Sequence, residues 1–321
     1  MIMVFDSLSR AFTTTRKLLF EPFDALKWLK WGVIVFLIQL TSGGPGPQLM
    51  WHGGGGKGSG HGDALKILLP FILFVGVFVL LIAVIIWAVF LYLSSRATFM
   101  YIHGVSKDSA QLGEAWRAHP KETLSLFWWR IFYSLGTVLI ILVTVGIPLI
   151  FFALRVSRHS LSAADIPFLV LAGLLLLLVG GAAALIGAIT KDFVAPIMVR
   201  RKVGVLTGWR EAISLLGPHV GSLALFYIMK VLLVVMAGGA IVAAVFMTCC
   251  CLIFFLIIPI IGQALTQPIH VFFRSWSLHF LGMLNPELDL FVQHEAIQEE
   301  SKKEEPGEEE SREEADEPEE E

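Results

Sequence analysis

Two basic residues interrupt the apolar stretches of this chain at positions where chemistry is possible. Lys230 lies roughly 12 Å inside one apolar segment if that segment is helical, and Arg130 has a similar but shallower position in another. Ionisable groups are costly to bury in a bilayer, and they commonly mark ion or substrate pathways. The alternative is that each long side chain extends its charged end to the membrane surface. Asp192, at the end of a further apolar segment, is the nearest candidate partner for Lys230.

A polar stripe is expected on the last apolar segment. Gln263, Gln267 and His270 follow one another at i, i+4 and i+7, which places them on one face of a helix. Such a face either lines a water-filled cleft or forms hydrogen bonds with neighbouring helices. The candidate intramembrane polar residues are therefore Lys230, Arg130, Asp192, His270, Gln263 and Gln267.

Several kinds of catalytic and metal site are missing from the sequence. No Asp or Glu lies in the middle of an expected span, which argues against a pump coupled to protons or sodium ions through buried carboxylates. Neither H-E-x-x-H nor G-x-S-x-G occurs. His52, His61 and Asp63 share a Gly-rich loop, which a metal would first have to order, so a simple connector is expected there. We predict no catalytic residues, no cofactor and no metal site, and hence a protein that is not an enzyme.

The elements that must position these residues are long runs without charge. No Asp, Glu, Lys or Arg occurs in Ile67 to Ser95, Ile131 to Leu154, Ile166 to Thr190 or Val231 to Phe273. A run of about 18 or more apolar residues is typical of a helix that crosses a bilayer roughly 30 Å thick. As a single helix the last run would be about 65 Å long, so the chain is expected to double back near residues 247–251.

We therefore predict an all-α polytopic membrane protein with six transmembrane helices, at residues 25–41, 67–94, 131–154, 166–190, 222–248 and 252–274. These helices form one domain, residues 1–292. Amphipathic helices are expected in the membrane interface before the odd-numbered spans, where apolar and basic residues alternate at helical spacing. Three repeated units of interfacial helix plus hairpin would explain this pattern. The ordinary enrichment of Trp, Tyr and Arg at membrane interfaces would explain it equally.

The distribution of Lys and Arg predicts the orientation. In the six-span arrangement 15 of these residues flank one side of the membrane and 4 flank the other. Because cytoplasmic loops carry the excess of basic residues, both termini are predicted to be cytoplasmic in a multi-pass protein of the cytoplasmic (inner) membrane. The basic loops are expected to attract anionic lipid headgroups of the bilayer, and no nucleic-acid partner is expected.

The C-terminal end has the opposite charge. Residues 293–321 contain 15 acidic and 3 basic residues, a net charge of −12, whereas the other 292 residues have a net charge of +9. A segment with so few apolar residues is expected to be a disordered acidic tail. It binds a basic protein partner, masks the basic loops, or serves only to keep the chain soluble.

Three segments carry a resemblance to known proteins: Ala11-Phe12 to Pro22-Phe23, Asp192-Phe193-Val194-Ala195-Pro196-Ile197-Met198, and Phe272-Phe273-Arg274-Ser275-Trp276-Ser277-Leu278. Through them the chain resembles a group of uncharacterised six-span prokaryotic integral membrane families. One of these is similar to the membrane domain attached to some glycerophosphodiester phosphodiesterases. The resemblance covers residues 5–286 and brings no catalytic residues, because the chain has no soluble phosphodiesterase domain.

These observations predict an integral membrane protein that organises the membrane or binds lipids or partner proteins without catalysis. The alternative is a transporter or exporter component with a polar cleft around Lys230, Arg130 and the last helix. Prolines within or beside the expected spans favour that alternative, because interrupted helices commonly form transporter sites.

Overall fold

The computed structural model describes residues 2–21, 23–40, 62–107, 112–156, 165–249 and 251–291, with side chains omitted at 62–72 and 112. Helices make up almost all of these ranges, and no strand occurs within them. The all-helical prediction is therefore confirmed for this part of the chain. The acidic tail and most of the Gly-rich loop, including His52 and His61, lie outside it. The predictions made for those segments stay predictions.

Four helical stretches in the described ranges are long and apolar enough to cross a membrane. The first stretch belongs to α3 (Gly62–Lys107), and the second consists of α5 (Pro120–Ile141), the π-helical turn η1 (Leu142–Gly146) and α6 (Ile147–Val156). The third consists of α7 (Ile166–Ile189), the π-helical turn η3 (Thr190–Val194) and α8 (Ala195–Arg201). The fourth consists of α9 (Val205–Leu216), η4 (Gly217–His219) and α10 (Val220–Met247). Their apolar side chains are mostly exposed, as expected for helices that face lipid. The chain is a membrane protein of helical type.

The prediction of six spans was wrong at both ends of the domain. α2 (Ala25–Gln39) has 15 residues and is about 22 Å long, which is less than the hydrocarbon thickness of a bilayer. The C-terminal end of α2 lies beside Ser94, which is far from the start of α3. The Ser94 hydroxyl donates a hydrogen bond to the Ile38 carbonyl at 2.9 Å. The expected last span, 252–274, is divided among α11 (Cys251–Ile257), α12 (Pro259–Leu265) and the beginning of α13 (Gln267–Leu284).

Prolines explain these interruptions. Proline has no backbone N–H, and it disfavours the helical conformation of the residue before it. Ile258, directly before Pro259, is extended, with φ −70° and ψ 117°. Pro268 occupies the first turn of α13, where its missing N–H costs nothing. The turn expected near residues 247–251 is present, since α10 ends at Met247.

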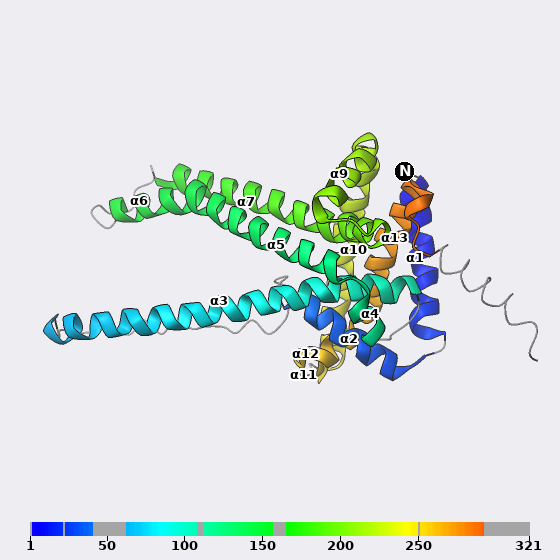
Figure 1. Cartoon of the computed structure of the whole chain (residues 1–321), viewed down its shortest axis with the longest axis horizontal. Helices are drawn as coiled ribbons and strands as arrows, with labels where there is room; N and C mark the ends of the chain where they lie inside the picture. Colours follow the sequence, from blue (N-terminus) through cyan, green and yellow to red (C-terminus); the bar gives the residue numbers. More distant parts are fainter. Residues whose placement is uncertain are drawn as a thin grey trace, which may run out of the picture.

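The buried core lies at one end of α3, α5 and α7, and α10 runs across this end (Figure 1). There α1 (Ile2–Phe20) packs along α13, and the Trp276 indole donates to the Ser7 hydroxyl at 3.0 Å. The largest fully buried side chains include Trp31, Trp276, Phe99, Phe193, Phe226 and Phe280. We call this end the base. It comprises α1, α2, α4 (Leu112–Ala118), α8, α9, α13 and the adjoining ends of α3, α5 and α10.

Separate helices occur at the three positions where interfacial helices were predicted. α1, α4 and α9 precede α2, α5 and α10, respectively. α9 lies close against α8 because Gly208 has no side chain, since a Cβ there would lie 3.1 Å from atoms of Val194 and Met198. The base therefore fixes the positions of the polar residues at the adjoining ends of the long helices.

Candidate functional site

Lys230 of α10 and Asp192 of η3 form an ion pair. The Lys230 ammonium lies 2.5 Å from Asp192 Oδ2, and the two side chains are 20% and 11% exposed. The Tyr227 hydroxyl donates to the same carboxylate oxygen at 3.4 Å. The ammonium also lies 5.7 Å from the ring centre of Phe226, within range of a cation–π interaction. The structure thus brings together the two residues for which the sequence suggested a partnership.

The π-helical turn η3 places Asp192 at this position. Such a turn adds one residue to a helical turn, and π-turns are frequent at functional sites. Pro196 follows directly in α8 and has no N–H to donate to the Asp192 carbonyl four residues earlier. The local sequence therefore favours a departure from regular α-helix where the carboxylate lies.

Arg130 of α5 is held by hydroxyl groups of α3. Its Nη1 donates to Ser94 Oγ and Ser95 Oγ, both at 3.2 Å, and its Nη2 donates to Thr98 Oγ1 at 3.1 Å. These partners are neutral, and none of the ion pairs found within the described ranges involves Arg130. The hydroxyls orient the guanidinium without neutralising its charge.

Two further cations, which are not among the residues predicted for the site, reach the same region. Arg274 of α13 donates from Nη1 to the Lys191 carbonyl at 2.8 Å, and its guanidinium lies 5.8 Å from the ring centre of Tyr101. Lys191 lines one cavity together with Arg130, Asp192 and Lys230, and another together with Asp192 and Arg274. Two signals for these residues were present in the sequence: Lys191 adjoins Asp192, and Arg274 ends the longest uncharged run.

Two cavities share Lys191 and Asp192 in their linings. The first, which we call the groove, has a volume of about 620 Å³ and lies between α5, α7 and α10. Arg130 and Lys230 line its polar end, while its apolar wall includes Leu91, Val138, Ala183, Ala184, Gly187 and Ala188. The second, which we call the inner cavity, has a volume of about 280 Å³, and its lining includes Gln39, His270 and Arg274.

The expected polar stripe does not form on one helix, because the chain breaks between α12 and α13 at Thr266. His270 lines the inner cavity, and its Nε2 lies 3.4 Å from the Gln39 amide nitrogen. Gln263 of α12 and Gln267 of α13 are buried and line neither cavity. Both amide atoms of Gln267 lack a hydrogen-bond partner within the described part of the chain. Of the six candidates, the structure therefore groups Lys230, Asp192, Arg130 and His270 around the two cavities.

The charge of this cluster determines what it can bind. Arg130, Lys191, Lys230 and Arg274 surround the carboxylate of Asp192, so the cations exceed the anions by three. Electrostatic attraction is stronger in a low-dielectric environment than in water, so the cluster suits an anionic ligand. Across the described ranges, no three His, Cys, Asp or Glu residues are grouped so that they could hold a metal ion.

Comparison with known proteins gives a family and no activity. No curated protein and no solved structure significantly matches the chain, and none of these comparisons shows similarity to glycerophosphodiester phosphodiesterases. Residues 2–266 match the model of a family described as "Family of unknown function (DUF7544)". The matched range contains Arg130, Asp192 and Lys230, whereas His270 and Arg274 lie beyond it. The expectation of an uncharacterised family is confirmed, and the chain belongs to this family of unknown function.

Proposed function

We propose that this protein binds an anionic membrane lipid in the groove without catalysing a reaction on it. The observation that carries the proposal is the excess of positive charge at the polar end of a cavity whose wall is apolar. A ligand with a phosphate headgroup and an acyl chain would match both parts.

The charge of Arg130 supports the headgroup assignment. Its hydrogen-bond partners in α3 are hydroxyls, so its positive charge is not offset by a contacting carboxylate of the described chain. A buried charge without a counterion is costly, and an anionic headgroup in the groove would reduce that cost. A guanidinium matches the geometry of phosphate oxygens and can bind two of them at once.

The composition of the wall supports the acyl-chain assignment. The α7 face of the groove consists of small residues, Ala183, Ala184, Gly187 and Ala188, which leave space beside the helix. Leu91 and Val138 add larger apolar surfaces. The volume of about 620 Å³ lies within the usual range for small-molecule sites.

Native mass spectrometry of the detergent-purified protein tests this proposal. The delipidated protein would be titrated with phosphatidylglycerol and, separately, with zwitterionic phosphatidylcholine. We expect phosphatidylglycerol to bind more tightly, and we expect Arg130→Gln to weaken its binding about tenfold, as for loss of a charge-assisted contact. Arg155→Gln is the matched control, because Arg155 is 68% exposed and does not line the groove. Equal binding of the two lipids, or equal effects of the two substitutions, would contradict the proposal.

A transporter or exporter component is the second candidate. It is favoured by the position of Lys191 and Asp192, which line both the groove and the inner cavity. A solute that passed between these cavities would contact this pair. The test is a single cysteine, Lys230→Cys, in a chain whose native cysteines are replaced by serine. Modification by a small water-soluble thiol reagent from each side of the membrane in turn supports transport. A cysteine that the reagent modifies from only one side, or from neither side, argues against transport.

A further inference from the structure

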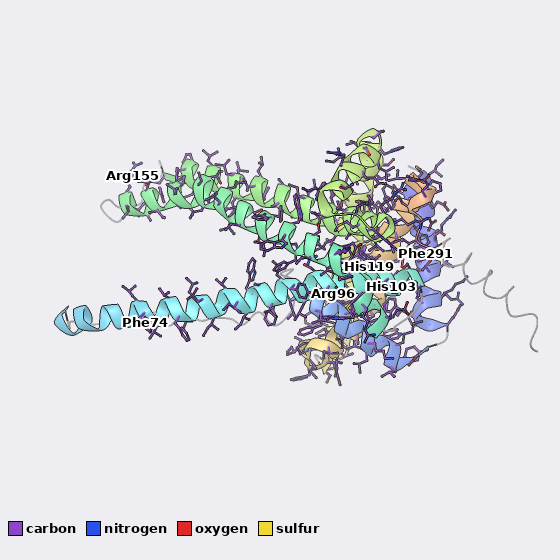
Figure 2. All side chains as sticks on the ribbon, in the orientation of Figure 1. Phe74, Arg96, His103, His119, Arg155 and Phe291 are labelled. Carbon is purple, nitrogen blue, oxygen red and sulfur yellow. The ribbon has the colours of Figure 1, made fainter. Side chains whose placement is uncertain are left out.

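A third cavity lies in the base, apart from the groove and the inner cavity. Its volume is about 850 Å³, and it lies between the C-terminal end of α3, α4 and the C-terminal end of α8. The charged residues that line it are Lys107, Glu114, Arg117, Arg200 and Lys202. Two histidines, His103 and His119, also line it, with ring centres 6.1 Å apart (Figure 2). We call it the basic cavity.

The basic cavity has an excess of positive charge. Glu114 is the one carboxylate in its lining, and it already lies 3.3 Å from the Lys107 ammonium. Arg117 and Lys202 are exposed, and neither belongs to any ion pair formed among the described residues. The pKa of His119 is lowered, mainly by burial, with the charges of Lys202 and Arg96 contributing and that of Glu122 opposing. These observations indicate a site for a polyanion.

The chain leaves the described structure beside this cavity. Leu290 is part of the cavity lining, and the last described residue is Phe291. The ring of Phe291 stacks on that of His279 with ring centres 4.3 Å apart. These contacts fix the point from which the acidic C-terminal segment starts.

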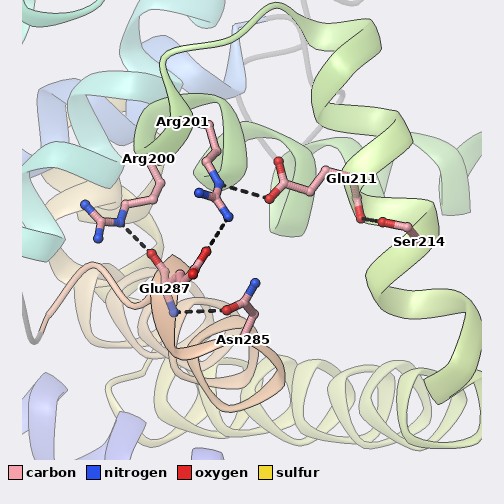
Figure 3. Close-up of polar contacts among 6 residues, drawn as sticks. All are labelled: Arg200, Arg201, Glu211, Ser214, Asn285 and Glu287. Carbon is pink, nitrogen blue, oxygen red and sulfur yellow. Dashed lines mark hydrogen bonds and ion pairs between the residues drawn. The ribbon is translucent and has the colours of Figure 1, made fainter.

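A polar cluster holds this exit point against α8 (Figure 3). Arg201 Nη2 lies 2.7 Å from Glu287 Oε2, and Arg201 Nε lies 3.1 Å from Glu211 in α9. Arg200, which also lines the basic cavity, donates from Nε to the Glu287 carbonyl at 2.7 Å. The segment around η5 (Pro286–Leu288) is thereby joined to the wall of the cavity.

We propose that the acidic segment 293–321 of the same chain docks in the basic cavity. Its net charge of −12 complements that of the cavity, and its covalent connection at Leu290 keeps it at a high local concentration there. Exposed ion pairs are individually weak and are screened by salt. The docked state is therefore reversible and sensitive to ionic strength. It occupies a surface that would otherwise be open to other polyanions.

Limited trypsin digestion tests the docking, because the tail contains cleavage sites at Lys302, Lys303 and Arg312. Mass spectrometry would measure the initial rate of cleavage at these sites in the full-length, detergent-purified protein. We expect the double variant R117E/K202E to be cleaved in the tail about fivefold faster than the wild type at low salt, since two exposed positive charges that would attract the acidic tail are reversed. We expect the two rates to converge at about 0.5 M salt, where the Debye length is a few Å.

The matched control is the double variant K17E/R210E, which makes the same change in net charge at exposed residues outside the cavity. We expect it to be cleaved at the wild-type rate. Equal rates in all three proteins, or equal acceleration by both double variants, would overturn the proposal. Protection that disappears when the wild type is diluted would also overturn it, because the tail of another copy would then be the occupant. The neutral variant R117Q/K202Q, checked by its thermal unfolding, provides the same comparison if charge reversal prevents folding.

Discussion

At the scale of single residues, the environment of Lys230 decides between two interpretations of a charge within an apolar helix. A lysine that extended to the membrane surface would have a solvated ammonium, whereas that of Lys230 contacts Asp192 and the side chain is 20% exposed. The pair lies in the lining of the groove. The Tyr227 hydroxyl donates a hydrogen bond to the same Asp192 carboxylate oxygen and so helps to hold it in place.

Replacement of Lys230 by methionine is expected to destabilise the protein by about 3 kcal/mol, because it leaves the buried Asp192 carboxylate without its cation. The double variant D192N/K230M is expected to recover part of this loss, since no unpaired charge then remains. Thermal unfolding in detergent measures both effects, with Lys17→Met as the control, because Lys17 is exposed and belongs to no ion pair among the described residues. A double variant as unstable as Lys230→Met would show that the ion pair is not the cause.

His279 gives the base a predicted dependence on pH. Its Nε2 lies 2.8 Å from the Thr14 hydroxyl, and burial lowers its pKa from 6.5 to about 4. The charges of Asp289 and Asp6 oppose this shift and that of Arg10 adds to it. In the unfolded chain the ring binds a proton near pH 6.5, whereas in the folded chain it resists protonation until about pH 4. The folded state is therefore favoured above pH 6.5 and loses stability as the pH falls from 6.5 toward 4.

The measurement is the midpoint of thermal unfolding at pH 7 and pH 5, for the wild type and for His279→Gln. We expect the midpoint of the wild type to fall more steeply between these values, because glutamine does not bind a proton there. Identical pH dependence in the two proteins would assign the effect to other groups.

At the scale of helices, α2 near the start of the domain and α12 near its end cross one another at close distance. A Cβ at Gly32 would lie 3.0 Å from the Ile260 carbonyl oxygen and 3.1 Å from Ala264 Cβ. The two helices are therefore in near-backbone contact, as small residues allow in membrane proteins. α2 and α12 each have too few residues to span the bilayer, and they pack on one another in this crossing.

Gly32→Ala is expected to lower the stability by about 1–2 kcal/mol, because the added methyl group forces the helices apart. Gly76→Ala in α3 is the matched control. A Cβ there meets no atom within 4 Å, and alanine has the higher helix propensity, so we expect no loss of stability. Thermal unfolding of the two variants in the same detergent measures the difference. Equal midpoints would contradict the assigned crossing.

At the scale of the whole molecule, the base is well separated from the far ends of α3, α6 and α7 (Figures 1 and 2). Arg155, at the end of α6, lies far from His103 and His119 in the base (Figure 2). α1 and the end of α8 both belong to the base. If the stretches formed by α3, by α5 with α6 and by α7 with α8 cross the membrane, Lys202 lies on one side of it and Arg155 on the other.

Single-cysteine labelling tests this arrangement in a chain whose Cys249, Cys250 and Cys251 are replaced by serine. A membrane-impermeant thiol reagent is expected to modify Lys202→Cys from one side and Arg155→Cys from the opposite side. The excess of Lys and Arg on the side of the base predicts that this side is cytoplasmic. Modification of Lys202→Cys and Arg155→Cys from one side only would exclude the spanning arrangement.

The sequence by itself determined the class of this protein. A long uncharged run in a bilayer must satisfy all of its backbone hydrogen bonds internally, and a helix does so. Composition alone was therefore enough to predict an all-helical membrane protein. The partnership of Lys230 with Asp192 was also foreseeable, because Asp192 follows the end of one uncharged run and Lys230 precedes the start of the next, so consecutive spans bring the two residues to the same side of the membrane. Helix ends were not foreseeable from composition: the breaks at Pro259 and Pro268 divided an apolar run that was long enough to span.

Only the tertiary structure decided which charges share a site. Arg274 and Lys191 are 83 residues apart in the chain, yet the Arg274 guanidinium donates to the Lys191 carbonyl. Arg130 reaches the same groove because α5 packs on the hydroxyl-bearing turn of α3. The distribution of charge along a sequence predicts the ends of helices, whereas the packing of the base determines which ends meet. The excess of positive charge in the groove depends on that packing, because it is the sum of charges on separate helices.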